Sequence, residues 1–247
     1  MKLLNNETCK YASLVANSAV VNYPVSNILD SRLSRIFKTD SNTTATIVFD
    51  AGSAVIVNSI AIANHNISSS VTTLKIQGNA TDIWTSPSVD ETLTYSSGII
   101  TKLFTGGSYR YWRIQIVDGS NPDGYISIGR AWVGKYFTMP YISPIIGHSR
   151  VSKSVKSVSV SGQSYMDARY FNSTIAVKFP LVTHAEKANM IAEFERIDIG
   201  VPFFVTFDET DSDLGILYVT IDQDSLNFNL LRNRNYYETA LSLIEEI

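Results

Sequence analysis

The sequence contains almost no cysteine and no long apolar run. Cys9 is the only cysteine among 247 residues, which excludes an intrachain disulfide and a thiolate metal cage. No apolar run approaches the ~18 residues needed to span a bilayer. The segment after Met1 also lacks the basic and apolar regions of a signal peptide. We therefore expect a chain without a membrane span that is made in a cytoplasm and is soluble there.

Positive charge is also scarce. The formal net charge is −3 and the pI is near 5.6, whereas binding to phosphate backbones needs a clustered basic surface. This excludes a general nucleic-acid partner. The charge is unevenly divided, because residues 1–140 carry a net +2 and residues 141–247 a net −5. That shift, together with Pro140 and Pro144, predicts a domain boundary near residue 140.

The reactive groups of an enzyme are sparse. The sequence has no GxSxG motif, no P-loop and no Rossmann glycine run. His65, His148 and His184 lie far apart in the chain, outside any metal-ligand spacing. The acidic run 208–213 does not follow the ligand order of an EF-hand, and an exposed loop is the interpretation we prefer. We expect no catalytic residue, no metal and no cofactor, and hence no enzyme.

Short β-branched and aromatic runs separated by Gly, Pro, Ser, Thr and Asn indicate an all-β architecture. The stretch 43–66 has two apolar runs around Ala51-Gly52-Ser53, which predicts two paired strands. Its second run, Val55 to Ala63, is apolar on both faces. We therefore expect it to lie inside a sandwich of two sheets.

Further alternation predicts a hairpin downstream. Trp112, Ile114 and Ile116 fall on one face of the run 109–117, and the turn 118–124 then leads into the run 125–134. Exposed aromatic rings commonly stack on sugars, and the candidates in this half are Trp84, Tyr95, Tyr109 and Tyr125. Most of the four are expected to pack in the core, since cross-strand packing explains a single aromatic residue better than ligand contact.

The C-terminal half contains strands and one convincing helix. Thr183 and Glu186 form a capping box, an apolar stripe follows, and Gly200 stands where a C-terminal cap belongs. The pattern predicts a helix over about 184–199. The fold class is therefore mainly β with one helix, in two domains, 1–140 and 141–247.

The first domain resembles a known family. Asn27-Ile28-Leu29-Asp30, then ATIVFDAG, then RYWRIQIVDGSNPDGYISIGRAWVG occur in order. Together they are similar to the discoidin-type, galactose-binding-like jelly roll appended to bacteriophage tail proteins. The likeness covers roughly residues 20 to 137 and implies a jelly-roll sandwich.

A sugar site in this domain is expected to be weak or absent. Phe37-Lys38 stands where such domains often have Trp. A ligand, if bound, is expected to contact the loops 39–42 and 64–70. Within these loops the candidate ligand-binding residues are Asp40, Asn42, Asn64, His65 and Asn66. Loop packing is the more common role for a residue such as His65.

The second domain resembles the ring-forming domain of phage distal tail and minor tail proteins. The likeness rests on Ser161-Gly162, Phe179-Pro180, the segment PFFVTFD and the terminal LSLIEE, and spans about 150 to 247. It implies a small β-sandwich or split barrel with one helix. The strands 151–160 and 236–244 are the expected edges through which a homo-oligomeric ring closes. A hexamer is preferred and a trimer is the alternative.

The preferred interpretation is a structural component of a phage tail tip, in the distal tail or baseplate ring. Its location would be the virion, after synthesis in the host cytoplasm. Its partners would be the tail tube, hub and tape-measure proteins, and a host surface glycan for the jelly roll. The alternative is a carbohydrate-binding module or lectin without a structural role. A glycan hydrolase ranks last, because it would need two carboxylates facing one cleft.

Overall fold

The computed structural model describes residues 1–9, 13–40, 43–207, 215–232 and 235–246. The chain forms two compact units, one from Lys2 to Phe137 and one from Thr138 to Ile247 together with Met1. Strands dominate both units, and the described residues contain one α-helix. The predicted mainly β fold class with one helix is therefore confirmed.

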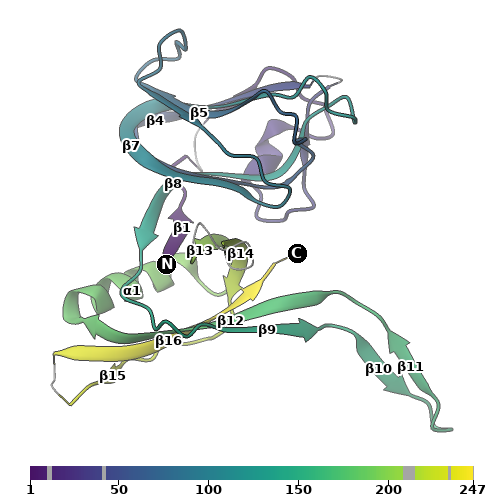
Figure 1. The fold of residues 1–247 in the computed structure, drawn as a ribbon, viewed down its shortest axis with the longest axis vertical. Coiled ribbons are helices and arrows are strands. Elements are labelled where there is room, and N and C mark those ends of the chain that lie inside the picture. Colours follow the sequence, from purple (N-terminus) through teal and green to yellow (C-terminus); the bar gives the residue numbers. More distant parts are fainter. Residues whose placement is uncertain (10–12, 41–42, 208–214, 233–234, 247) are drawn as a thin grey trace. The chain divides into compact units, whose positions relative to one another are not determined.

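The N-terminal unit is an antiparallel β-sandwich of the jelly-roll type (Figure 1). Five strands follow one another in the order β6-β5-β7-β4-β8, while β2 pairs with β4 and β3 with β8. A short 3₁₀ helix, η1, precedes β3. The elements are β1 (Lys2–Asn6), β2 (Ser13–Ala16), η1 (Val25–Leu29), β3 (Phe37–Lys38), β4 (Thr44–His65), β5 (Thr73–Asn79), β6 (Val89–Thr92), β7 (Ile100–Val117) and β8 (Ser127–Thr138).

Strand β4 organises this unit. It runs unbroken for 22 residues, and both of its halves pair with β7. The prediction of two strands paired with each other is therefore wrong. The pairing with β7 shifts register between Asp50 and Val55 and again between Val57 and Ser59, so the strand bends instead of turning back. Gly106 permits the second shift, because a Cβ there would lie 1.9 Å from the Val57 carbonyl oxygen.

The core lies where the bent strands enclose it. The predicted burial of 55–63 on both faces holds for Ser59 to Ala63 alone, because Ile56 is 48% exposed and Val55 is half-buried. Trp112, Ile114 and Ile116 of β7 are also fully buried, which confirms the predicted inward face. Phe37 is fully buried in the same cluster. Phe37, which stands where similar domains often have Trp, thus packs in the core and does not offer its ring to a ligand at the surface.

The predicted hairpin of residues 109–117 with 125–134 does not form. Strand β8 pairs with β4 from Ser59 to His65, and β4 lies between β8 and β7 in the sheet order. The apolar second half of β4 pairs with both strands. Strand β7, which precedes the turn 118–124, and strand β8, which follows it, therefore lie on opposite sides of β4.

One buried ion pair belongs to the N-terminal unit. Arg130 Nη2 donates to Glu7 Oε2 at 2.6 Å, and the two side chains are 6% and 7% exposed. Arg130 Nη1 also donates to the Ile28 carbonyl oxygen at 3.0 Å. The pair therefore joins the segment after β1, η1 and β8.

The C-terminal unit is an antiparallel sheet with a helix on it (Figure 1). Its strands follow the order β13-β14-β16-β12-β9, with β15 paired to β16 and a separate β10–β11 hairpin. The elements are β9 (Gly147–Ser152), β10 (Val155–Val158), β11 (Ser164–Asp167), β12 (Phe171–Thr183), α1 (His184–Ile197), β13 (Phe203–Thr206), β14 (Ile216–Ile221), β15 (Asn229–Leu230) and β16 (Tyr236–Glu245).

Helix α1 begins at the predicted capping box. Thr183 Oγ1 accepts from the Glu186 amide, and the Glu186 carboxylate accepts from the Thr183 amide at 2.8 Å. The helix ends two residues earlier than predicted. Asp198 has a φ of 58°, a left-handed conformation that Gly200 was expected to supply, and its amide donates to the Phe194 carbonyl.

The prediction that residues 236–244 form a free edge is wrong. Strand β16 pairs with β12 along most of its length, with β14 near its end and with β15 near its start. Strand β9 instead stands at the end of the strand order. The predicted strand 151–160 is divided between β9 and β10. Leu241 and Leu243 of β16 are buried, as expected for an interior strand of a sheet that is covered on one face.

The β10–β11 hairpin extends away from helix α1, at the far end of β9 and β12 (Figure 1). We call residues 147–171 the arm. Strands β9, β10 and β11 are exposed along their whole length. Large apolar side chains of the arm are exposed, including Val151, Val155, Val158, Tyr165 and Met166.

The buried ion pair gives a stability prediction. Glu7→Ala leaves the Arg130 charge without its carboxylate in a dry site, so the free energy of unfolding falls by about 3 to 5 kcal/mol. Urea denaturation measures the change. The control is Glu91→Ala, which removes the partner of Lys102 in a pair with side chains 32% and 31% exposed and costs less than about 1 kcal/mol. Equal losses in the two variants would contradict the assignment of the Glu7 pair as a main stabilising contact.

Candidate functional site

Three loops meet at one end of the N-terminal sandwich. The loop after β3 is fixed by Thr39, whose amide donates to the Ile126 carbonyl at 2.9 Å and whose hydroxyl accepts from the Ile126 amide at 2.8 Å. The loop after β4 is fixed by Asn66, whose side-chain oxygen accepts from the Ser127 amide at 2.7 Å. The two loops singled out in the sequence thus contact the same third segment, residues 118–127.

A buried carboxylate fixes the third loop. Asp118 is fully buried. Its oxygens accept from the Ser68 amide at 2.8 Å, the Ser68 hydroxyl at 2.6 Å and the Asn121 side-chain amide at 2.9 Å. Asn121 also donates to the Asn66 carbonyl at 2.9 Å. Because a charge out of water needs such donors, this network holds the loops in one conformation.

Asn66 takes part in this network. Its side-chain nitrogen donates to Asp123 Oδ2 and to the Tyr125 carbonyl, each at 2.9 Å, while its side-chain oxygen accepts from Ser127. Both ends of the carboxamide are therefore engaged within the protein. These contacts favour a structural role over contact with a ligand.

The neighbouring Asn64 and His65 also face the protein. Asn64, with a φ of 51°, donates from its side chain to the Leu33 carbonyl at 2.6 Å. His65 Nδ1 accepts from the Ile67 amide at 3.2 Å, and the ring meets Tyr95 edge-on at 6.4 Å between centroids. Burial lowers the pKa of His65 below its usual value. The imidazole is thus a neutral packing group at pH 7.

Asp40 is the predicted site residue that the structure leaves open to solvent. Its backbone amide donates to the Ser18 hydroxyl at 2.9 Å, and the residue is exposed. Asn42, the remaining candidate, lies outside the described residues. The set predicted from the sequence therefore comprises two asparagines that bond to distant segments, one packing histidine, one exposed carboxylate and one undescribed residue.

The four aromatic candidates differ in their surroundings. Tyr95 and Tyr109 pack against the hydrophobic core, and Tyr109 also meets Trp112 at 6.0 Å between centroids. Trp84 lies against the Arg113 guanidinium at 4.5 Å and donates to Asp82 at 2.6 Å. Tyr125 belongs to the three-loop end, where the Lys38 ammonium lies 3.4 Å from the centre of its ring.

We define the loop-end site as Lys38, Asp40, Asp123 and Tyr125. The Asp118 network positions Asp123 and Tyr125, because Asn66 bonds both, and Lys38 lies in β3, which pairs with β8. The site offers an aromatic face, one cationic donor and two exposed carboxylates as acceptors. The sequence hypothesis missed Lys38 and Asp123 as site residues. The pairing of Lys38 with Ser127 brings Lys38 to Tyr125, and Asp123 precedes Tyr125 by two residues in the same loop.

Three further kinds of site concern the described part of the chain: a metal site, a membrane-spanning helix and a reactive thiol. These residues contain no group of three or more His, Cys, Asp or Glu side chains arranged to hold a metal ion. The acidic run 208–213 lies outside them. Within the same residues no helix is both long and apolar enough to cross a bilayer. Burial raises the pKa of the Cys9 thiol to about 12, so the reactive thiolate is suppressed.

Comparison with known proteins gives structural matches alone. No family model matches the chain, and no curated protein matches it in sequence. The lectin domain of lectinolysin, complexed with Lewis b antigen, is 11% identical with a TM-score of 0.43 and covers 52% of this chain and 96% of its own. A family 32 carbohydrate-binding module from Clostridium perfringens NanJ, in complex with galactose, is 17% identical with a TM-score of 0.43 and covers 56% and 100%.

A Streptococcus pneumoniae fucose-binding module is also similar, at 11% identity and a TM-score of 0.42, covering 53% of this chain and 95% of that module. The three similar structures are thus carbohydrate-binding modules or lectin domains. None of the three is a phage tail protein.

The loop network gives a prediction that separates folding from binding. Asn66→Ala removes three side-chain hydrogen bonds at the loop end and leaves the Ser127 amide without its acceptor, so the free energy of unfolding falls by about 1 to 3 kcal/mol. Thermal or urea unfolding measures this. Asp40→Ala, at an exposed neighbour in the same loop cluster, is the control and changes stability by less than about 0.5 kcal/mol. An unchanged stability in Asn66→Ala would show that the network does not hold the loops.

Proposed function

We propose that the N-terminal unit binds a carbohydrate at the loop-end site. The observation that carries the proposal is the position of Tyr125, which lies at the meeting point of three loops with the Lys38 ammonium on its ring, while the same loops carry the exposed residues Asp40 and Asp123. Aromatic rings have an electron-rich face. The C–H groups along one side of a sugar ring are weakly positive and stack on such a face.

The residues around Tyr125 complement the remaining groups of a sugar. Lys38 donates hydrogen bonds, and the carboxylates of Asp40 and Asp123 accept them, which suits hydroxyls that do both. The Lys38 ammonium occupies the ring face in the structure. Its flexible stem allows it to move aside and donate to a bound hydroxyl. Specificity for one sugar would come from the spacing of the two carboxylates.

The expected affinity is low. Phe37 is buried, so the site has one aromatic ring where a second exposed ring would enclose the ligand. A shallow site of this kind gives a Kd on the order of 1 mM, or about −4 kcal/mol. Such affinity becomes useful when several copies act together on one surface.

The test is sugar binding by Tyr125→Ala. Saturation-transfer NMR with methyl glycosides of galactose, fucose and N-acetylgalactosamine should show binding to the unmodified chain. Tyr125→Ala should weaken it at least about tenfold, because the stacking face is lost. Trp84→Ala is the matched control. Trp84 likewise has a cation on its ring, the Arg113 guanidinium, but lies outside the three-loop end, so its loss should leave binding unchanged. Binding lost with Trp84 and retained without Tyr125 would place the site elsewhere.

A structural role in a phage tail tip is the second candidate, and the arm favours it. A two-stranded hairpin has marginal stability by itself, and large exposed apolar patches mark interaction surfaces. The arm carries four Lys or Arg and one Asp, whereas residues 172–247 carry five Lys or Arg and thirteen Asp or Glu. A basic arm and an acidic body in one chain are complementary between copies.

In this second candidate, the arm of one subunit covers the body of the next and closes a homo-oligomeric ring in the virion. Six subunits are preferred and three are the alternative. The proposed partners are the tail tube, hub and tape-measure proteins. The two candidates are compatible, because a ring would present several loop-end sites to one glycan surface.

Replacing apolar arm residues tests the assembly. Val155→Asp combined with Val158→Asp puts two charges on a fully exposed hairpin, so the fold should persist while the oligomer is lost. Native mass spectrometry and sedimentation velocity measure the mass. Ser157→Asp, between these positions, is the control for added charge alone. A monomer already present in the unmodified chain at high concentration would overturn the assembly role.

A further inference from the structure

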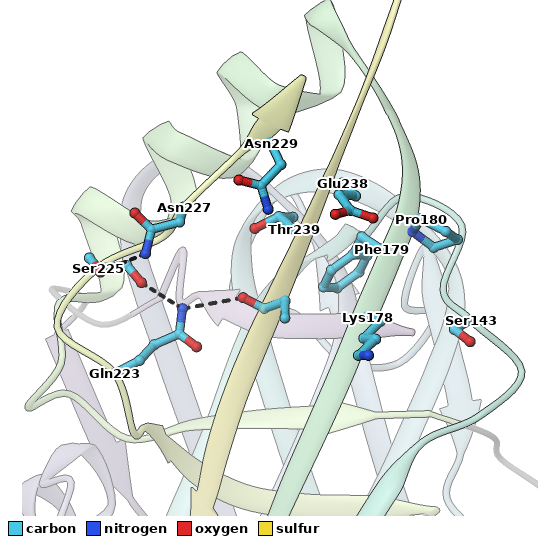
Figure 2. A pocket seen from close by; sticks show the side chains of 11 residues that line it. Ser143, Lys178, Phe179, Pro180, Gln223, Ser225, Asn227, Asn229, Glu238 and Thr239 are labelled. Carbon is cyan, nitrogen blue, oxygen red and sulfur yellow. Dashed lines mark hydrogen bonds between the residues drawn. The ribbon is translucent and has the colours of Figure 1, made fainter. Parts of the chain in front are cut away.

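The pocket beside the β12–β16 pair of the C-terminal unit favours no single class of ligand. Figure 2 shows the loop 223–227 on one side of it and Lys178 on the other. Lys178 and Glu238 give its lining one charge of each sign, and the Thr239 hydroxyl is closed off from solvent. The N-terminal unit, in contrast, holds a titratable ring at a position where its charge would have a defined effect.

That ring is the imidazole of His65, enclosed at the end of strand β4. His65 pairs with Ile128 of β8, and cross-strand partners share one face of a sheet. Ile128 is fully buried in the hydrophobic core, so the side chain of His65 is on the core side. The ring meets Tyr95 edge-on, and Tyr95 packs against the same core. A group that can gain a charge thus occupies an apolar setting.

The two ring nitrogens decide which form of the imidazole fits there. Nδ1 of His65 accepts a hydrogen bond from the Ile67 amide at 3.2 Å, so this nitrogen carries no proton. The proton of the neutral ring is therefore on Nε2. This nitrogen is closed off from solvent, and no atom of the described residues forms a hydrogen bond with it. The arrangement fits the neutral ring.

A second proton does not fit. It would sit on Nδ1 of His65, which would then be a donor facing the N–H of Ile67, another donor. Burial lowers the pKa of His65, and the backbone of Gly98 and Ser96 raises it to a smaller extent. Among the described residues, no charged side chain contributes to this pKa shift. The titratable group beside the ring is the phenol of Tyr95, which supplies no negative charge in neutral or acid solution.

The residues on either side of Ile67 hold the loop-end site. Asn66 bonds Asp123 and the Tyr125 carbonyl, each at 2.9 Å. Ser68 donates from its amide and its hydroxyl to the buried carboxylate of the third loop. Ile67 itself is 4% exposed and belongs to the core cluster. A shift of the Ile67 amide away from the imidazole therefore loosens both attachments.

From this geometry we infer that His65 is an acid-sensitive switch of the loop end. Charging of its imidazole breaks the hydrogen bond to the Ile67 amide and releases the segment 65–68. For its consequence the inference rests on the proposed carbohydrate binding. Release of the segment frees Tyr125 and Asp123 from Asn66, so that bound sugar dissociates in acid.

The direction of the pH effect follows from proton linkage. In the open loop the imidazole is in water and has its ordinary pKa of about 6.5, whereas burial in the closed loop lowers the pKa of His65. The open form therefore binds more protons below about pH 6.5, and acid favours opening. The gain grows until the pH reaches the lowered pKa of the closed form and is constant below it.

Amide hydrogen exchange without any sugar tests the switch itself. Between about pH 7 and pH 5, after correction for the intrinsic exchange rate, the protection of the Ile67 and Ser68 amides should fall at least about threefold. His65→Gln retains a side-chain acceptor and takes up no proton, so it should abolish this fall. His148→Gln, at an exposed histidine of β9, is the matched control and should retain it. Constant protection in the unmodified chain, or the same fall in His65→Gln, overturns the inference.

A titration of the unmodified chain applies even where His65→Gln does not fold. The ring signals of His65 should titrate at a lower pH than those of a histidine in the urea-unfolded chain, because burial lowers the pKa. The loss of Ile67 protection should follow the same curve. Protection that is lost at a pH where the His65 ring does not titrate would assign the opening to another group and overturn the inference.

Sugar binding measures the consequence of the switch. A methyl glycoside that binds the unmodified chain at about pH 7 in saturation-transfer NMR should bind at least about threefold more weakly at pH 5, and His65→Gln should bind it equally at both. The same weakening in His65→Gln contradicts the switch. Absence of binding at either pH overturns the carbohydrate proposal, and the exchange measurement then decides on the switch alone.

Discussion

The N-terminal unit depends on one constraint, the burial of residues 59–63 of β4 on both faces of the strand. A strand covered twice needs a hydrogen-bonding partner on each side, and β7 and β8 fill these places. The first half pairs with the same β7 only if the strand bends. The bend occurs where Gly106 allows close backbone contact with Val57. The order of the neighbouring strands, and hence the end at which the loops gather, follows from this bend.

Buried charged side chains hold the segments between the strands in place. Glu7 and Arg130 join three segments that are distant in the sequence, and Asp118 collects three donors from two loops. Each group would be costly alone, because its desolvation exceeds what one contact returns. The contacts between Glu7, Arg130 and the Ile28 carbonyl, and the three donors to Asp118, instead make one arrangement of these segments more favourable than the others. The rigid placement of Tyr125 is a consequence of Asp118 acting through Asn66.

The two units have different surface chemistry. The N-terminal unit has a half-buried tyrosine ring under a lysine ammonium at the end where three loops meet. The C-terminal unit extends an apolar, basic arm from an acidic body, which suits contact between copies. Weak binding at single sites and assembly of many copies reinforce each other, since linked sites act at high effective concentration. The proposed carbohydrate binding and the proposed assembly of copies are therefore compatible.

Part of the site could be found from the sequence. The loops 39–42 and 64–70 were expected to contact a ligand on the resemblance to a jelly roll, and the structure joins Thr39 and Asn66 of these loops to residues 126 and 127. The roles of individual residues were not accessible. Asn66 and Asp40 are both polar loop residues in the sequence. Asn66 joins two loops because its side chain bonds to Asp123 and to the Tyr125 carbonyl, which are distant in the sequence. Asp40 has an exposed side chain instead.

The sequence by itself determined the features that depend on near neighbours. The mainly β class, the inward face of Trp112, Ile114 and Ile116, and the capping box of Thr183 and Glu186 follow from alternation and from contacts within a few residues. Tertiary structure decided that β4 bends, that β8 lies across β4 from β7, and that β16 is an interior strand. Each of these depends on which distant strand supplies the hydrogen bonds. A period of two residues along one strand carries no information about that partner.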